Sequence, residues 1–344
     1  MGNLSVGGRS VALLFTAAAS GGSACGTEPA PPAPERWARA FDAAETGWLL
    51  SAWGSGASDL RVVGGAPGAG RVVRFDGAAW IDETLPEGTG LLNWIFGYGP
   101  EDVFAVGEGG VVLHFDGTRW REEPTPTEED LWGVWGAGPT EPLWAVGGRG
   151  RAEGQATLLR REAGVWTRVE LPPLQRPGVD ALFKVWGSGP DDVFVVGQRG
   201  AVLRFDGAEW TEDGVGTSQD LIAVWGTGPG DVFVVGGRGN GVAARFDGVG
   251  WTRFDLGPTP GLNGVVSTGP REVWVAGEVG TVGRLDAEGL LELEQPPLTA
   301  EERALDFHAV FRGPNGLTAV GGNFAQPSGP YVGLAWQRQL GDGS

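Results

Sequence analysis

Short runs of Val, Phe and Trp alternate with glycine-containing turns along most of this chain. The fullest copy of the pattern covers residues 182–220, which are LFKVWGSGPDDVFVVGQRGAVLRFDGAEWTEDGVGTSQD. Four runs in it, LFKVWGS, DVFVVG, AVLRFDG and EWTEDG, have the residue types of strands and are separated by turn residues. In GPDD the proline presets the backbone for a type I turn, and in FDGxxW the Asp-Gly pair reverses the chain. The segment therefore predicts four short antiparallel strands.

The same segment recurs seven times along the sequence. Units of about 40–50 residues open at Trp48, Leu91, Leu131, Leu182, Leu221, Leu262 and His308. Small sheets repeated at this period can bury their faces on one another when they are arranged around a ring. We therefore predict an all-β fold, a seven-bladed β-propeller of four-stranded antiparallel blades.

Large aromatic residues recur at two positions of the unit, and we expect them to pack between blades because each ring buries a large apolar area. The first column holds Trp53, Phe96, Trp135, Trp186, Trp225, Val266 and Phe311. The second column holds Trp80, Trp120, Trp166, Trp210 and Trp251, with Leu290 in the sixth unit.

The two ends of the repeat array predict how the ring closes. The seventh unit stops after its third run, YVGLAWQRQL (331–340), whereas ERWARAFDAAETG (35–47) precedes the first unit and has the pattern of the missing fourth strand, with Trp37 in the second aromatic column. We expect this N-terminal strand to complete the last blade, which removes an exposed sheet edge. The predicted propeller spans residues 35–340, and residues 341–344 form a tail.

Residues 1–24 have the pattern of an export signal. Arg9 precedes VALLFTAAA (11–19), an apolar run too short to cross a bilayer as a helix. Small residues then lead to Cys25, the only cysteine of the chain, so no disulfide can form within it. We predict a signal peptide over residues 1–24 and a polar, proline-rich tether over residues 25–34.

This arrangement resembles the signal of bacterial lipoproteins, in which the cysteine after the cut is lipidated. Gly22 stands where the lipobox of that family usually has Leu, so cleavage by an ordinary signal peptidase stays an alternative. The resemblance implies lipidation of Cys25 and a location at the outer membrane, with the periplasm or the cell surface as alternatives. We expect the chain to contact the membrane through this anchor alone.

The acidic composition narrows the range of partners. The formal net charge of −18 at pH 7 disfavours binding to nucleic acid or to an anionic membrane surface. Lys184 is the only lysine, and we interpret this as a bias of composition rather than as chemistry. We expect the chain to act as a monomer.

The residue inventory does not favour catalysis. His114 and His308 are the only histidines and lie in different units, so a site of three histidines around a metal is impossible. A metal loop at Asp191 and Asp192 is less favoured than a simple turn, because the same turn recurs in other units. A pair of carboxylates for glycoside hydrolysis stays an alternative, although none stands out from the repeat. We expect no catalytic residue, no metal and no cofactor.

The units WGSGPDDVFVVG…GAVLRFDGxxW resemble those of secreted bacterial lipoproteins of the propeller class, and their layout is similar to that of tectonin-type propeller lectins. The likeness covers nearly the whole chain after the signal. It implies a fold and leaves the activity open.

One face of the predicted propeller is variable. The GPDD and FDG turns are nearly uniform, whereas the connections after the second and fourth strands differ between units and lie on the opposite face, which we take as the binding face. Two residues beyond the VG of the second strand, Arg149, Arg199 and Arg238 occur in consecutive units. One hypothesis is that this arginine arc binds an anionic group, such as a carboxylate sugar or an acidic loop of a partner. Three solvated arginines at hairpin tips are the interpretation that we favour.

The expected function is that of a non-enzymatic, envelope-anchored scaffold that binds a protein or a glycan through its variable face. A lectin with sugar sites between blades is the second interpretation. Trp94 and Trp132 are then the candidates for stacking on a sugar ring, because they lie outside the two aromatic columns and, unlike Trp144 and Trp274, do not replace the Phe of DVFVVG. Buried packing of both rings is the interpretation that we favour. A propeller-class glycoside hydrolase or lyase is the third interpretation.

Overall fold

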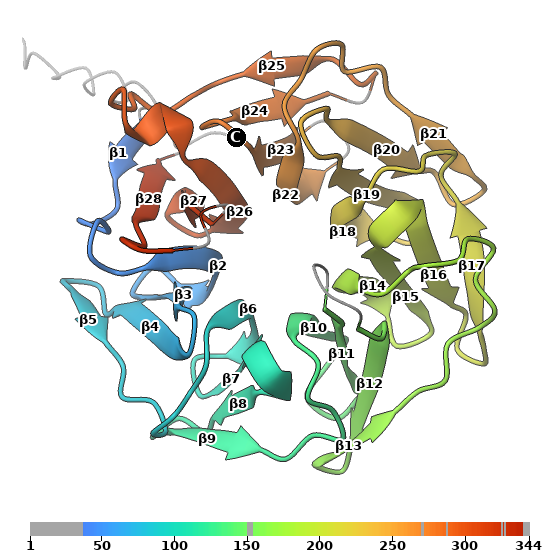
Figure 1. Cartoon of the computed structure of the whole chain (residues 1–344), viewed down its shortest axis with the longest axis horizontal. Coiled ribbons are helices and arrows are strands. Elements are labelled where there is room, and N and C mark those ends of the chain that lie inside the picture. Colours follow the sequence, from blue (N-terminus) through green and yellow to red (C-terminus); the bar gives the residue numbers. More distant parts are fainter. Residues whose placement is uncertain are drawn as a thin grey trace, which may run out of the picture. The chain divides into compact units, whose positions relative to one another are not determined.

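The computed structural model describes residues 37–149, 154–269, 272–286, 288–324, 326 and 328–339. Figure 1 shows seven four-stranded sheets arranged as a ring around a central space. Cys25, the predicted signal peptide, the predicted tether and the predicted tail lie outside the described residues.

From its innermost to its outermost strand, blade 1 consists of β2 (Trp48–Gly56), β3 (Asp59–Ala66), β4 (Ala69–Phe75) and β5 (Trp80–Asp82). In the same order, blade 2 consists of β6 (Leu92–Gly99), β7 (Asp102–Gly107), β8 (Val112–Phe115) and β9 (Trp120–Glu123). Blade 3 consists of β10 (Leu131–Gly136), β11 (Leu143–Gly147), β12 (Thr157–Glu162) and β13 (Val165–Arg168). Blades 4 and 5 are β14 (Leu182–Gly189), β15 (Asp192–Gly197), β16 (Ala201–Phe205) and β17 (Trp210–Gly214); and β18 (Leu221–Gly228), β19 (Asp231–Gly236), β20 (Val242–Phe246) and β21 (Trp251–Arg253). Blades 6 and 7 are β22 (Leu262–Gly269), β23 (Glu272–Gly277), β24 (Val282–Leu285) and β25 (Leu291–Leu293); and β26 (Asp306–Gly313), β27 (Gly316–Gly322), β28 (Gly333–Arg338) and β1 (Trp37–Arg39).

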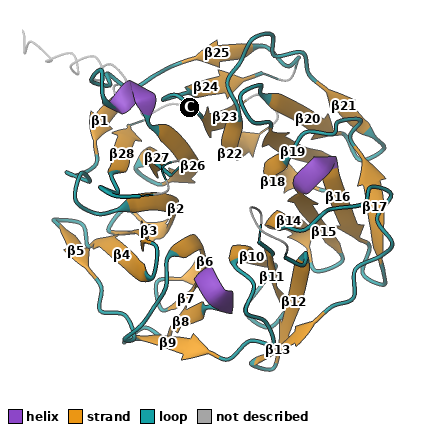
Figure 2. Ribbon diagram, viewed as in Figure 1, coloured by secondary structure: helices purple, strands orange, loops and turns teal. Residues whose placement is uncertain are grey.

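Helical structure in the described part of the chain consists of three short 3₁₀ turns, drawn in purple in Figure 2. They are η1 (Glu108–Gly110), η2 (Gln198–Gly200) and η3 (Glu302–Ala304). No helix among the described residues is long and apolar enough to cross a membrane.

The ring closes as predicted. Strand β1 pairs antiparallel with β28, with Trp37 opposite Arg338, and so supplies the fourth strand of blade 7. Trp37 is buried and packs edge-on against Trp274 of blade 6, with the ring centroids 6.5 Å apart. The N-terminal strand thus contributes to the blade interface as well as to the sheet.

The second aromatic column differs from the prediction in blade 6. Leu285 pairs with Leu291, just as Phe205 pairs with Trp210 in blade 4, so Leu291 occupies the tryptophan position. Leu290 is 69 % exposed and belongs to the turn. The turn before β25 is one residue longer than its equivalents, so the spacing of the other blades points to Leu290 instead of Leu291.

The glycine that follows the first aromatic column is required by the packing of one blade on the next. The ring of Trp135 lies over Gly187, and a Cβ atom there would be 2.5 Å from the ring. Trp186 lies over Gly226 in the same way, at 2.6 Å. The WG pair of the repeat is therefore a lock between neighbouring blades, because any side chain on the glycine would displace the tryptophan.

A β-bulge near the start of every innermost strand is the second device of the repeat. It inserts one extra residue into the strand, at Leu50, Asn93, Trp132, Phe183, Ile222, Asn263 and His308. The final glycine of VVG permits the close approach of the backbones at the bulge. A Cβ atom on Gly197, for example, would be 2.6 Å from the carbonyl oxygen of Ala181. The recurring glycine therefore fixes where the seven bulged residues lie.

In blades 1, 4 and 5 the turns of the uniform face are held by hydrogen bonds within the blade. Asp192 accepts hydrogen bonds from the Ser188 hydroxyl (2.5 Å) and from Nε of Arg204 (3.0 Å). Blades 1 and 5 repeat this arrangement around Asp59 and Asp231. The interpretation of GPDD as a structural turn agrees with these contacts, and the described residues contain no cluster of three or more His, Cys, Asp or Glu side chains able to hold a metal ion.

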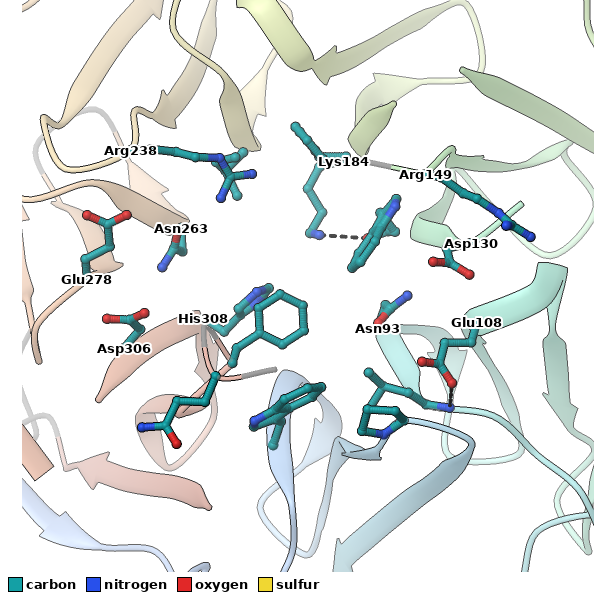
Figure 3. A pocket seen from close by; sticks show the side chains of 18 residues that line it. Asn93, Glu108, Asp130, Arg149, Lys184, Arg238, Asn263, Glu278, Asp306 and His308 are labelled. Atoms are coloured by element: carbon teal, nitrogen blue, oxygen red, sulfur yellow. Dashed lines mark hydrogen bonds between the residues drawn. The ribbon is translucent and has the colours of Figure 1, made fainter. Parts of the chain in front are cut away.

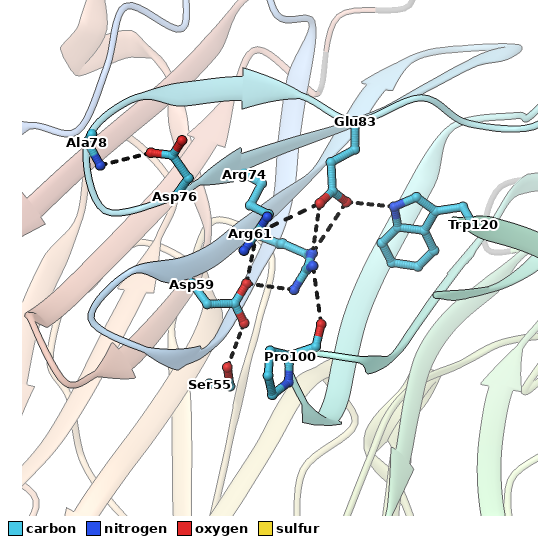
Figure 4. Close-up of polar contacts among 9 residues, drawn as sticks. All are labelled: Ser55, Asp59, Arg61, Arg74, Asp76, Ala78, Glu83, Pro100 and Trp120. Atoms are coloured by element: carbon cyan, nitrogen blue, oxygen red, sulfur yellow. Dashed lines mark hydrogen bonds and ion pairs between the residues drawn. The ribbon is translucent and has the colours of Figure 1, made fainter. Parts of the chain in front are cut away.

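A buried ion-pair cluster of blade 1 is joined to blade 2 by a hydrogen bond (Figure 4). Arg61, only 1 % exposed, lies 2.8 Å from Asp59 and 3.2 Å from Glu83. Glu83 also accepts a hydrogen bond from the indole of Trp120 in the next blade, at 2.6 Å. Equivalent indole bonds run from Trp166 to Glu123 and from Trp251 to Asp213. An acidic residue three positions after one blade's outer tryptophan position thus holds the tryptophan of the next blade.

Candidate functional site

A cavity of about 640 Å³ lies at the centre of the variable face. Figure 3 shows its lining side chains, which come from the starts of the innermost strands and from the hairpins that follow the second strands. Six of the seven bulged residues line it; Leu50 is the exception. The volume is in the range of pockets that bind a small molecule or a few inserted side chains.

Aromatic rings cover part of the cavity wall. Phe324, from the hairpin after β27, lies edge-on to Trp48 with ring centroids 4.8 Å apart and also contacts Trp132 and His308. Phe183 completes this apolar part of the wall. A ligand entering the cavity would therefore bring apolar surface against these rings as well as polar groups.

Lys184 reaches the cavity from blade 4 and is 4 % exposed. Its Nζ donates a hydrogen bond to the Trp132 carbonyl oxygen (2.7 Å) and lies 4.3 Å from the centroid of the Trp94 ring. A Cβ atom on Gly133 would lie 3.1 Å from the Lys184 Cα. The glycine therefore leaves room for this contact between blades. Burial lowers the pKa of Lys184 to about 7.

Two buried polar groups in the wall lack a hydrogen-bond partner. Asn93, 1 % exposed, donates from Nδ2 to the Leu131 carbonyl oxygen (2.9 Å), but its Oδ1 has no partner among the described residues. Nδ1 of His308 is likewise unpartnered. Removal from solvent lowers the pKa of His308 to about 3, so the imidazole is neutral at pH 7.

Four carboxylates surround the cavity as two pairs on opposite sides (Figure 3). One pair is Glu108 and Asp130, where blades 2 and 3 meet, and the other is Glu278 and Asp306, where blades 6 and 7 meet. Burial and the neighbouring glutamate raise the pKa of each aspartate above its usual value.

The predicted arginine arc is divided by the structure. Arg149 and Arg238 line the cavity, but each faces a carboxylate of its own chain: Glu129 at 3.5 Å and Asp220 at 3.1 Å. Arg199 is not among the lining residues. Its Nε donates to the carbonyl oxygen of Gly178 (2.8 Å), so its side chain is held by the connection between blades 3 and 4.

The backbone explains why Arg199 turns away from the cavity. The residue has a φ of 56°, in the left-handed region, where Gly109 and Val279 also lie in their own blades. The backbone N–H groups at these three positions donate to an aspartate of the next blade, which for Arg199 is Asp220 at 3.0 Å. The backbone at this position is therefore fixed by the turn, and the turn sets the direction of the side chain.

The two tryptophans proposed for sugar stacking have different surroundings. Trp132 is half-buried, lines the cavity and donates its indole N–H to the Gly148 carbonyl oxygen (2.6 Å). Trp94 is half-buried beside Lys184 and does not line the cavity. The sequence did not single out Glu108, Asp130, Glu278 or Asp306. Their signal was positional, since each lies next to the glycine or the strand start that borders a bulge.

His114 lies outside the cavity, on β8. It stacks on Phe104 with ring centroids 4.1 Å apart, and Nε2 lies 2.8 Å from Asp102. Blades 1, 4 and 5 have an arginine at this position, paired with the equivalent aspartate. His114 therefore replaces one member of a structural ion pair.

The fold and the cavity define the chain as a seven-bladed β-propeller with a pocket at one end of its central channel. Its fold is similar to the solved structure "YCF48 bound to D1 peptide", at 16 % identity and a TM-score of 0.63 over 88 % of this chain and 97 % of that one. A YCF48 structure from Cyanidioschyzon merolae gives 16 % identity and a TM-score of 0.63 over 88 % of this chain and 98 % of that one. The WD40 β-propeller domain of Doa1 gives 10 % identity and a TM-score of 0.65 over 88 % of this chain and 97 % of that one. No family model matches the sequence, and no curated relative matches it.

Proposed function

We propose that this chain is a non-enzymatic scaffold that binds a protein partner at its variable face, with the central cavity as the main contact. The observation that carries this proposal is the difference between the two faces. The uniform face consists of turns closed by their own aspartates, whereas the variable face opens into a cavity of about 640 Å³ whose lining differs from blade to blade. A surface that varies while its frame repeats is typical of recognition.

The structural likeness supports this proposal by analogy. One of the similar propellers is described as bound to a peptide, and another is a WD40 domain. At 10–16 % identity the likeness extends to the fold alone, so the choice of a protein partner for this chain rests on its own cavity.

Envelope anchoring is the second part of the proposal. It rests on the sequence before the propeller, where Cys25 follows an export-signal pattern and precedes a proline-rich segment. Expression with a radiolabelled fatty acid tests it: the unchanged chain incorporates label and Cys25→Ser does not. Label in both chains, or in neither, contradicts the lipid anchor.

Photo-crosslinking tests the binding face within one blade. A photoreactive phenylalanine is introduced at Pro67, which is exposed and lines the cavity, or at Ala78, which is exposed in the FDG turn of the same blade. In cells we expect a defined protein adduct from the first position and none from the second. Adducts from Ala78 alone, or equally from both, contradict the proposed face.

A glycan array separates the lectin interpretation from protein binding. Saturable binding to a sugar, lost in Trp132→Ala and retained in the control Trp80→Phe, would favour the lectin. We expect no such binding, together with a protein adduct at the variable face.

A further inference from the structure

The carboxylates around the cavity are held in place by the backbone but are not neutralised. Oε2 of Glu108 accepts hydrogen bonds from the N–H groups of Gly68 (2.8 Å) and Leu91 (3.0 Å), and Oδ1 of Asp130 accepts one from Gly109 (3.0 Å). These bonds fix one oxygen of each side chain. The second oxygen of each has no hydrogen bond within the described part of the chain.

The opposite wall repeats this arrangement. Oε2 of Glu278 accepts hydrogen bonds from Gly239 (2.8 Å) and Gly261 (3.0 Å), and Oδ1 of Asp306 accepts one from Val279 (2.9 Å). Two acidic pairs therefore face the same cavity, each oriented by amide groups that a ligand need not disturb.

Each cation near the cavity has its closest partner outside the two acidic pairs. Arg149 and Arg238 lie against Glu129 and Asp220, and neither forms an ion pair with the four cavity carboxylates in the described residues. Lys184 directs its ammonium to the Trp132 carbonyl oxygen and the Trp94 ring. The four cavity carboxylates thus outnumber the cations of the wall and keep free acceptor oxygens, while the terminal nitrogens of Arg149 and Arg238 have no hydrogen bond within the described residues.

The buried polar atoms that lack a hydrogen-bond partner among the described residues independently favour a ligand with donor groups. Oδ1 of Asn93 can only accept a hydrogen bond, and Asn93 lines the cavity at 1 % exposure. Leaving such an acceptor unpaired in a buried position costs free energy that a ligand with donor groups would recover. The unpartnered Nδ1 of His308 lines the same cavity.

We propose that the cavity receives a basic side chain, an arginine or a lysine, from the protein partner, bound at the Glu108–Asp130 pair beside Asn93, with the Glu278–Asp306 pair adding negative charge from the opposite wall. This inference rests on the proposed function and adds the chemistry of the group that is bound. The rings of Trp48, Trp132 and Phe324 provide apolar surface for the aliphatic stem, and an aromatic face attracts a cation. Charge-assisted hydrogen bonds to the free carboxylate oxygens and to Asn93 Oδ1 would hold the charged end.

Peptide pools test the inference on the purified full chain. The probes are acetylated, amidated, fluorescently labelled hexapeptide pools that differ only in one fixed central residue: Arg, Lys, Gln, Glu or Leu. We expect the Arg and Lys pools to bind at least tenfold more tightly than the Gln pool by fluorescence anisotropy. The Glu pool should bind most weakly.

The chain itself provides a conservative variant. Gln198 occupies in blade 4 the position of Glu108 and Glu278, and its Oε1 accepts the N–H of Asp180 at 2.8 Å. The double substitution Glu108→Gln and Glu278→Gln should therefore retain the backbone bonds while removing two charges. It should weaken binding of the Arg pool tenfold or more. The matched control, Glu122→Gln with Glu209→Gln, removes two exposed charges away from the cavity and should leave binding unchanged.

Each other result overturns the inference. Equal affinity for the Arg and Gln pools, or equal loss in the two double variants, shows that the cavity carboxylates do not select a cation. Preference for the Glu pool assigns the cavity to an anion and favours Arg149 and Arg238 as ligands. Absence of binding by every pool contradicts the inference as well, while a protein adduct at Pro67 would still support the proposed function.

Discussion

The indole of Trp120 donates a hydrogen bond of 2.6 Å to Glu83, which belongs to the preceding blade and also faces the buried guanidinium of Arg61. Glu83 thus joins two blades through one side chain. Removing it would leave Arg61, at 1 % exposure, with one of its two carboxylate partners and Trp120 with an unpaired indole.

Glu83→Ala should therefore lower the free energy of unfolding by about 3–5 kcal/mol, the usual cost of breaking a buried ion pair from one side. Asp213→Ala is the control, because Asp213 accepts the indole of Trp251 without a buried arginine. It should cost about 1–3 kcal/mol. Urea titration followed by tryptophan fluorescence measures both, and an equal loss in the two variants would show that Arg61 does not depend on Glu83.

The buried indole N–H of Trp210 has no hydrogen-bond partner among the described residues, because Val169 stands where blades 1 and 2 place the glutamate. Val169→Glu should supply the missing acceptor and stabilise the fold by about 1 kcal/mol. Val165→Glu adds the same charge four residues earlier, at the start of β13 and at a side chain that is 61 % exposed, and should change the stability by less than about 0.5 kcal/mol. A lower unfolding midpoint for Val169→Glu than for the control would contradict this account of the missing bond.

The contact between Trp135 and Gly187 predicts a strict requirement for glycine. Gly187→Ala would place a methyl group 2.5 Å from the tryptophan ring and 2.6 Å from the carbonyl oxygen of Asp192, so it should destabilise the fold by about 1–3 kcal/mol. Gly189→Ala, two residues further on, meets no atom within 4 Å and should be nearly neutral. Thermal unfolding of the two variants decides, and similar melting temperatures would mean that the ring moves freely.

Lys184 predicts a pH dependence of stability. Burial lowers its pKa from 10.5 to about 7, so the unfolded chain binds the proton more tightly than the folded one. The contribution of this group is therefore complete above the unfolded pKa and is lost progressively as the pH falls toward 7. Lys184→Met removes the titrating group, and its free energy of unfolding should change less between pH 7 and pH 9 than that of the unchanged chain. Urea titrations at both pH values give the free energies of unfolding. An equal change between pH 7 and pH 9 in the two chains would exclude a perturbed lysine.

The sequence predicted the features that the repeat states seven times. The number of blades, the order of strands and the closure through Trp37 follow from the periodic pattern. Residues with the same structural role in every blade recur at equivalent positions of the sequence units, so they can be recognised by alignment. The exception was blade 6, where one added turn residue moved Leu290 out of the column and Leu291 into it.

The candidate site was less predictable because it depends on backbone geometry that periodicity does not encode. The bulge at Asn93 and His308 is set by a pairing register, and a period of two along the strand does not indicate which residue is the inserted one. Arg199 had the right spacing but lies in a left-handed turn whose side chain meets Gly178, in a long connection that most blades lack. The buried place of Lys184 is not visible in the repeat, because its contact with Trp94 crosses an intervening blade.

The pairing of β1 with β28 has a mechanical consequence. Among the described residues this strand comprises Trp37–Arg39, and this short segment closes the ring. Any pull on the chain from the N-terminal side of Trp37 arrives first at these three residues and tends to peel them from β28. Strand β1 therefore both closes the ring and bears this force. The burial of the Trp37 ring against blade 6 resists the separation of β1 from β28.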